Sequence, residues 1–290
     1  MLNFQEFMNE LLLEKLMIFG KRAYPKFGHV VILAGGAGSG KGYQRENLLG
    51  IEGKVFDVDE LKKMVIKSTK LAQQIKDETG QDIKSINLRI PANVSRMHEI
   101  IGDMYNIPNK HQQAMYTSII ASEPDKKPNL IFDVTLKDLK KLESISRNVQ
   151  DLGYEKKNIH IVWVVNDITV AIKQNNERSR VVPEEILMVT HEGAALTMKK
   201  ILDMGDKIRK YMDGAIYLSF NQEKVDTSAA KNENPRDAVA LPKRGGEGTY
   251  ITDANYIKVK EQGKAQTPSN KLGDSIYNKI KSYVPNIDTW

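Results

Sequence analysis

The chain has 290 residues, of which 40% are apolar and 28% are charged, so it is long enough to bury a sizeable core. Cysteine is absent, which excludes disulfides, thiolate metal sites and cysteine nucleophiles. No apolar run reaches the ~20 residues that span a bilayer, and the first residues lack the layout of a secretory signal, so we expect a cytoplasmic protein with no membrane partner. The net charge of +6 favours polyanionic partners, but the basic residues are scattered as on an ordinary solvated surface.

Hydrophobic periodicity predicts strands that alternate with helices. In chain order the predicted elements are a helix at 3–20, strands at 29–34 and 54–58, a helix at 59–76, a loop at 78–92, helices at 93–104 and 109–122, a strand at 129–134, a helix at 137–152, a strand at 159–165, a helix at 167–178, a long helix from Pro183 and a strand at 215–219. This order predicts an α/β fold whose parallel β-sheet is flanked by helices.

The composition changes beyond Asn221. Residues 222–248 are polar and predict a linker, the β-like runs at 249–252 and 255–260 predict a small hairpin, and 273–283 predicts a short helix. We therefore divide the chain into an N-terminal helix (1–22), an α/β domain (23–220), and a polar linker with a small mixed C-terminal extension (221–290).

A glycine-rich segment follows the first predicted strand and matches the phosphate-loop pattern G-x-x-x-x-G-K. Its residues are Gly35, Gly36, Ala37, Gly38, Ser39, Gly40, Lys41 and Gly42. Such a loop turns backbone N–H groups toward phosphate oxygens, and its lysine reaches the β- and γ-phosphates. The bland alternative is a glycine-rich turn that binds nothing, but the strand before the segment and the helix after it favour an ATP site, with Tyr43 at its end.

The loop lacks the hydroxyl that usually contacts Mg²⁺. Gly42 stands where serine or threonine is usual, and Tyr43 follows it. We therefore expect magnesium to be held by nucleotide oxygens, water and an acidic side chain elsewhere.

Asp57 and Asp59 follow the second predicted strand, where parallel sheets place ligands. Alternation along a strand would put both on one face, with Val58 opposite. A carboxylate there accepts the proton of an attacking hydroxyl or orients that hydroxyl. The alternative for Asp59 is to cap a helix that begins at Glu60.

Asp133 ends the third predicted strand and is a candidate ligand for Mg²⁺. Thr135 and Lys137 follow it and are candidates for hydrogen bonds to a substrate, although Thr135 also suits the cap of the next helix.

Two arginines, Arg178 and Arg180, precede Pro183 between two predicted helices. Guanidinium groups brought in by a lid stabilise the charge of a phosphoryl group in transfer, whereas the bland interpretation is a pair of solvated arginines. Four histidines have no metal-ligand spacing, and we interpret them as structural or surface residues: His98, His111, His160 and His191.

Residues 35–44, GGAGSGKGYQ, resemble the loop of adenylate kinases, which also place glycine after the lysine. The later motifs resemble the zeta-toxin-like kinases, a P-loop family. They are D-V-D at 57–59, D-V-T-L at 133–136 and the arginine segment at 177–183. The resemblance covers about residues 29 to 200 and implies a P-loop kinase fold, ATP and Mg²⁺ as cofactors, Asp59 as the base and Arg180 as the lid arginine. The family has glutamate in place of Asp133 and uses it for substrate, so metal and substrate contact both stay open.

The acceptor is not identified by the residues. The zeta-toxin-like resemblance implies a hydroxyl of a nucleotide sugar such as UDP-N-acetylglucosamine, and the adenylate-kinase-like loop implies a nucleoside monophosphate. A hydroxyl of modified DNA is a third candidate, as in related kinases of bacteriophages.

An alternative hypothesis, from outside the enzymes, is a nucleotide-binding virion protein that catalyses no reaction. The opening residues resemble the head-targeting leaders of T4-type phage proteins through an F-x-E-F core at 4–7, although so short a match arises easily by chance and we favour an ordinary amphipathic helix that packs on the domain.

Overall fold

The computed structural model describes residues 26–45, 51–222, 239–240 and 253–266. The predicted helices at 3–20 and 273–283, the phage-leader core, the run at 249–252 and most of the linker lie outside these ranges.

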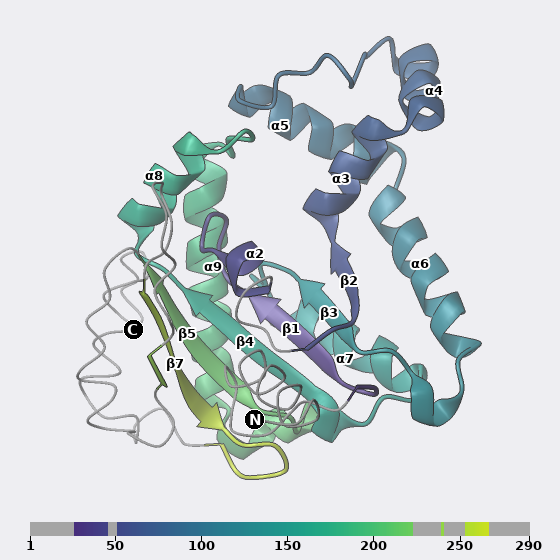
Figure 1. The fold of residues 1–290 in the computed structure, drawn as a ribbon. Coiled ribbons are helices and arrows are strands. Elements are labelled where there is room, and N and C mark those ends of the chain that lie inside the picture. The colour runs from purple at the N-terminus through teal and green to yellow at the C-terminus, as the bar shows by residue number, and fades with distance from the viewer. Residues whose placement is uncertain (1–25, 46–50, 223–238, 241–252, 267–290) are drawn as a thin grey trace, which may run out of the picture.

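One seven-stranded sheet forms the centre of the molecule, with the strand order β2-β3-β1-β4-β5-β7-β6 (Figure 1). The parallel strands are β1 (Val30–Ala34), β2 (Lys54–Asp57), β3 (Leu130–Asp133), β4 (Ile159–Val165) and β5 (Ile216–Gln222). β1 lies between β3 and β4, and all its residues are buried, which is why its sequence is a continuous apolar run. The predicted α/β fold is confirmed.

The C-terminal strand joins this sheet. β7 (Asp253–Lys260) runs antiparallel to β5, and β6 (Val239–Ala240) pairs with its other side. The run at 255–260 is thus part of a strand that lies against β5, while the other half of the predicted hairpin, 249–252, lies outside the described residues. Lys260 secures it: its buried ammonium lies 2.8 Å from Asp213 Oδ1.

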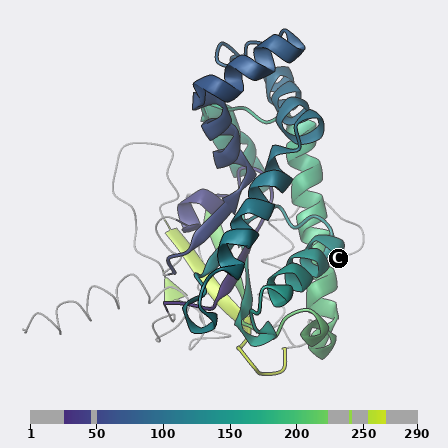
Figure 2. The ribbon, with the colours of Figure 1, turned by 90° about the vertical axis from the view of Figure 1, so that its right-hand side faces the viewer.

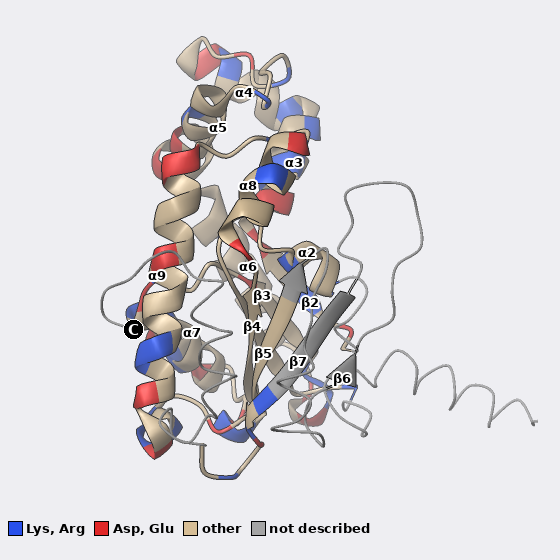
Figure 3. Ribbon diagram, turned by 90° about the vertical axis from the view of Figure 1, so that its left-hand side faces the viewer, with Lys and Arg blue, Asp and Glu red and all other residues tan. Residues whose placement is uncertain are grey.

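The helices are α2 (Lys41–Tyr43), α3 (Val58–Lys67), α4 (Thr69–Thr79), α5 (Pro91–His98), α6 (Ile107–Ile120), α7 (Leu139–Asp151), α8 (Ile168–Glu177) and α9 (Glu184–Asp203), with a π-helix at Glu99–Met104 and 3-10 turns at Pro124–Lys126, Lys156–Asn158 and Gly205–Lys210. Within the described ranges, none of these helices has the length and apolar character that a membrane crossing requires. On the side seen in Figure 3, bands of Lys and Arg and bands of Asp and Glu are dispersed over several helices, in agreement with scattered surface charge.

Two groups of helices lie differently with respect to the sheet. α7 and α9 pack on one face, where they share the largest apolar cluster with the strands. α3, α4 and α5 instead have a small apolar cluster of their own and stand beyond the carboxyl end of β2 (Figures 1 and 2). The sheet therefore ends beneath a helical cap that the chain inserts between β2 and β3.

The predicted helix at 59–76 is two helices. Ser68 has an extended backbone (φ −72°, ψ 113°) and ends α3, while its Oγ accepts a hydrogen bond from Leu71 N at 3.3 Å and so caps α4. The apolar periodicity continues through the break, because both helices contribute to the same small core. Only the capping preference of serine marks the break in the sequence.

Candidate functional site

The glycine-rich segment forms a loop between β1 and α2, at the carboxyl edge of the parallel sheet. Gly35, Gly38 and Gly40 have positive φ angles of 149°, 75° and 92°, which favour glycine. The chain also leaves no room for larger residues, since a Cβ at Gly35 would lie 2.7 Å from Val164 O. Lys41 begins α2, and its Nζ donates to the carbonyls of Gly35 at 2.8 Å and Gly36 at 3.0 Å. The lysine thus points into the concavity of its own loop.

Helix α9 contacts the other side of the loop. Ala37 N donates to Thr190 Oγ1 at 3.1 Å, and His191 Nε2 lies 2.7 Å from Ala37 O. Since a carbonyl only accepts, His191 carries its proton on Nε2. Burial lowers the pKa of His191 to about 4, against the opposing effect of the Ala37 hydrogen bond, so the ring is neutral at pH 7. The interpretation of His191 as structural agrees with this contact, which lies at the glycine-rich loop.

Asp57 is the N-cap of α3. Its Oδ1 accepts from Asp59 N at 2.8 Å and Glu60 N at 3.3 Å, and its Oδ2 lies 2.8 Å from Arg45 Nη1. Two expectations are therefore wrong: Asp59 is not the cap, and the two acids do not share a strand face, because the strand ends at Asp57 and Asp59 lies in the first turn of α3. Asp57, with both oxygens engaged, joins α2's end to the start of α3.

Asp59 is paired with the arginine segment. Its Oδ1 lies 2.5 Å from Arg180 Nη1 and 3.6 Å from Lys62 Nζ. Burial on its own raises the pKa of Asp59, but Arg180, Lys62 and Arg178 outweigh that effect and hold the pKa at about 2. The side chain keeps 41% of its surface exposed. Asp59 is an ionised carboxylate at the mouth of the cluster.

Asp133 is the most confined of the three acids. Its side chain is 11% exposed, and its oxygens lie 4.0 Å from Lys41 Nζ and 3.8 Å from Arg45 Nη1. Within the described part of the chain these long contacts are all that its oxygens have. Burial raises the pKa of Asp133 to about 6, with a smaller contribution from Asp57, and Lys41 and Arg45 oppose the rise.

Hydrogen bonds to its backbone groups join the arginine segment to α8 and to the loop before α5. Asn175 Nδ2 donates to Val182 O at 2.8 Å, and Asn175 Oδ1 accepts from Val182 N at 3.0 Å. Val181 N donates to Leu88 O at 3.0 Å in the loop before α5. These bonds place Arg180 over Asp59, while Arg178 is exposed and contributes only its charge.

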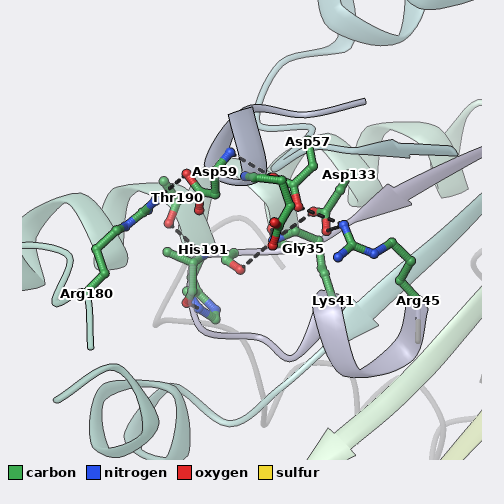
Figure 4. A network of polar contacts seen from close by, with 12 residues as sticks. Gly35, Lys41, Arg45, Asp57, Asp59, Asp133, Arg180, Thr190 and His191 are labelled. Carbon is green, nitrogen blue, oxygen red and sulfur yellow. Dashed lines mark hydrogen bonds and ion pairs between the residues drawn. The ribbon is translucent and has the colours of Figure 1, made fainter. Parts of the chain in front are cut away.

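The predicted residues divide into two groups. Lys41, Asp57, Asp59, Asp133 and Arg180 lie together in one polar cluster (Figure 4). Outside it, Tyr43 packs against an apolar cluster of the sheet, Thr135 meets the loop only through its carbonyl, which accepts from Gly35 N at 3.4 Å, and Lys137 packs beside Gly193 of α9. Thr135 does not cap α7 either, because Asp138 Oδ1 accepts from Lys140 N at 2.9 Å.

Four further residues of the cluster were missed from the sequence: Arg45, Lys62, Thr190 and His191. Arg45 had a usable signal, since it follows Lys41 by four residues and so lies one helical turn further on the same side. Thr190 and His191 had none, because their contacts join residues more than 150 positions apart.

A magnesium ion finds one suited ligand here. No group of three or more His, Asp or Glu side chains within the described ranges is arranged to hold a metal ion. Mg²⁺ at nucleotide sites needs fewer, since it takes one or two carboxylates and completes its shell with phosphate oxygens and water. Asp133 fits, because it is a buried strand-end carboxylate beside Lys41 whose oxygens have only long contacts.

No protein-family profile matches the sequence, and no curated protein matches it. Solved structures do resemble it. One is from the PezAT chromosomal toxin-antitoxin system of the human pathogen Streptococcus pneumoniae, with 14% identity, 77% of this chain and 78% of that chain covered, and a TM-score of 0.40. Another is AvrRxo1-ORF1:-ORF2 with ATP, with 12% identity, 96% and 72% covered, and a TM-score of 0.49. A third is AvrRxo1-ORF1:AvrRxo1-ORF2 with sulphate ions, with 10% identity, 96% and 72% covered, and a TM-score of 0.44. At these values the likeness concerns the general course of the chain, and the role of each residue rests on this chain's own geometry.

Proposed function

We propose that this chain is an ATP-dependent phosphotransferase of the zeta-toxin-like kind, which moves the γ-phosphate of ATP to an acceptor hydroxyl or phosphate. The observation that carries the proposal is the convergence of Lys41, Asp133 and the Asp59–Arg180 pair at the carboxyl edge of the parallel sheet. A phosphate loop alone supports nucleotide binding. An acid and an arginine opposite it supply what transfer needs in addition.

The loop and Lys41 bind the phosphates in this proposal. The Lys41 ammonium exchanges the carbonyls of Gly35 and Gly36 for the β- and γ-phosphate oxygens. Mg²⁺, when bound, neutralises phosphate charge, and Asp133 is the residue that would hold it. Asp57 takes no part in the chemistry but fixes the start of α3, and with it Asp59.

Asp59 and Arg180 act as a pair that separates. While they are paired, the low pKa of Asp59 makes it a poor base. When Arg180 turns to the γ-phosphate, Asp59 loses the partner that lowers its pKa most and becomes more basic. With a hydroxyl acceptor, the hydroxyl oxygen then bonds to the γ-phosphorus, its proton passes to Asp59, and the bond from that phosphorus to the oxygen of ADP breaks.

The charge near Asp59 favours an anionic acceptor. Lys62, Arg178 and Arg180 all lower the pKa of this single carboxylate, so positive charge is in excess around it. A nucleotide sugar, a nucleoside monophosphate and modified DNA all satisfy this condition.

The test is to incubate the purified chain with γ-labelled ATP and Mg²⁺ together with each acceptor class in turn. Label in one acceptor, lost in the Lys41→Ala variant, supports the proposal and names the acceptor class. ATP binding without transfer to any of them would favour the alternative of a nucleotide-binding protein without turnover.

A further inference from the structure

We propose that Thr190 and His191, consecutive residues of α9, are positioning residues that hold the phosphate loop in its binding shape. We call their contacts with Gly36 and Ala37 the α9 clamp. The inference rests on the proposed function in one respect, namely that the loop at 35–42 binds phosphate.

The clamp engages both backbone polar groups of Ala37. Thr190 Oγ1 donates its own proton to Leu187 O at 2.8 Å, which leaves a lone pair of the hydroxyl to accept from Ala37 N at 3.1 Å. His191 donates from Nε2 to Ala37 O at 2.7 Å. A loop residue whose N–H and C=O are both bonded by one helix cannot rotate about its backbone without breaking one of these bonds.

The ring of His191 also explains why position 36 is glycine. A Cβ at Gly36 would lie 2.2–2.5 Å from three atoms of this ring, closer than atoms can approach. Gly36 is not among the residues with positive φ, so its backbone conformation alone does not require glycine. His191 is 6% exposed, so its ring is held within the packed interior. Gly36 and His191 are therefore complementary in shape.

The clamp also sets the loop relative to the arginine segment. α9 begins at Glu184, directly after the segment that carries Arg180, and meets the loop two turns later at Thr190 (Figure 4). The segment is bonded to α8 through Asn175 and Val182. Because the arginine segment runs directly into the helix that bonds the loop, α9 couples the position of the phosphates on the loop to that of the guanidinium that approaches them. Such preorganisation matters for a glycine-rich loop, whose backbone otherwise has many accessible conformations.

The experiment uses the full chain and compares Thr190→Val, which removes the acceptor at nearly constant shape, with Thr190→Ser, which keeps it. Thr197→Val is the matched control, because Thr197 is buried on α9 two turns further and outside the clamp. Calorimetric titration with ADP and Mg²⁺ gives the affinity, a thermal melt gives the stability, and deuterium exchange of the peptide that contains residues 35–41 gives the mobility of the loop.

We expect Thr190→Val to weaken ADP binding about 3- to 10-fold and to speed exchange at the loop. We expect Thr190→Ser to restore both values and Thr197→Val to change only the melting temperature. Wild-type affinity and exchange in a folded Thr190→Val variant would overturn the proposal.

The shape relationship has its own test. Gly36→Ala alone is expected to weaken ADP binding more than His191→Ala does, and the double variant is expected to bind like His191→Ala, because the added methyl then meets no ring. Strictly additive effects of the two changes would refute the complementarity.

Failure of the proposed function gives a different result. If the wild-type chain binds no nucleotide, that function falls, and exchange at the loop still decides the clamp: faster exchange in Thr190→Val supports it and unchanged exchange refutes it.

Discussion

Asp57 and Asp133 stand in register at the ends of β2 and β3, yet Arg45 lies 2.8 Å from the first and 3.8 Å from the second. Asp57 also receives two backbone N–H groups, whereas the pKa of Asp133 is raised to about 6 by burial. Two carboxylates at equivalent positions on neighbouring strands thus differ in their contacts. Asp57 stabilises the start of α3 through short hydrogen bonds, whereas the carboxylate of Asp133 has, among the described residues, only long contacts with Lys41 and Arg45.

This difference predicts a gain of stability when Asp133 is neutralised. Because its folded pKa lies above the unfolded value of 3.8, the folded state holds the extra proton between about pH 4 and pH 6, and stability falls as the pH rises through that window. In metal-free buffer we expect Asp133→Asn to be more stable than the wild type at pH 7, by the order of 1–3 kcal/mol, and to lose that advantage at pH 4. Denaturant unfolding at both pH values measures this, and an equal advantage at both would contradict it.

Substitutions of Asp57 and Asp59 are expected to affect different properties, namely stability for Asp57 and phosphoryl transfer for Asp59. Asp57→Ala removes the cap of α3 and leaves Arg45 without its nearest acid, so it should lower the free energy of unfolding by about 1–2 kcal/mol. Asp57→Asn keeps the capping oxygen and should cost less. Asp59→Asn should leave stability and ATP binding largely intact and reduce phosphoryl transfer. A silent Asp59→Asn combined with an inactive but folded Asp57→Asn would exchange their roles.

Lys41→Ala should reduce transfer about 100-fold or more, because it removes the ammonium that lies within the loop's concavity, bonded to the carbonyls of Gly35 and Gly36. Lys76→Ala, which removes an exposed partner of Asp82, is the control. Full activity in Lys41→Ala would exclude the kinase proposal.

Substitution of Arg180 should lower the rate of phosphoryl transfer more than substitution of Arg178. Arg180→Gln removes the group that pairs with Asp59, and we expect transfer to fall about 100-fold, whereas the exposed Arg178 contributes only charge and Arg178→Gln should cost less than tenfold. Single-turnover transfer rates with saturating ATP would show the difference, and equal losses would remove the distinction.

The buried His29–His160 pair, far from the loop at the other end of β1 and β4, predicts acid lability. The rings are stacked with 2.9 Å between Nδ1 of His29 and Nε2 of His160, and burial, with His29 and Lys260, lowers the pKa of His160 to about 3. The unfolded chain binds protons here at a higher pH than the folded chain does. The stability is therefore complete above about pH 6.5 and is lost as the pH falls toward 3. The free energy of unfolding should drop between pH 7 and pH 5, and less steeply in His160→Gln.

The sequence predicted those features that are local. The apolar run of β1 and the glycines after it specify a buried strand that turns sharply into a helix, and Pro183 with Glu184 and Glu185 specifies the start of α9. Whether Asp57 or Asp59 is the cap depended on the residue at which β2 ends, and strand ends are not encoded by alternation alone.

The parts that were not predicted depend on contacts between distant segments. Ala37 meets Thr190, and Arg45 meets two strand ends, only once the sheet has formed. Neither a threonine nor a histidine inside an ordinary amphipathic helix carries a pattern that announces such a contact.

The antiparallel strand β7 has a consequence for solubility. Without it, β5 would present a seven-residue row of open backbone donors and acceptors to any other extended chain, which is the usual starting point of edge-to-edge association. Among the described residues, the last strand of the sheet to be synthesised is thus the one that covers the edge of β5. A nascent chain that has reached only β5 exposes this edge to association with other chains, and the ion pair of Lys260 with Asp213 forms when β7 covers it.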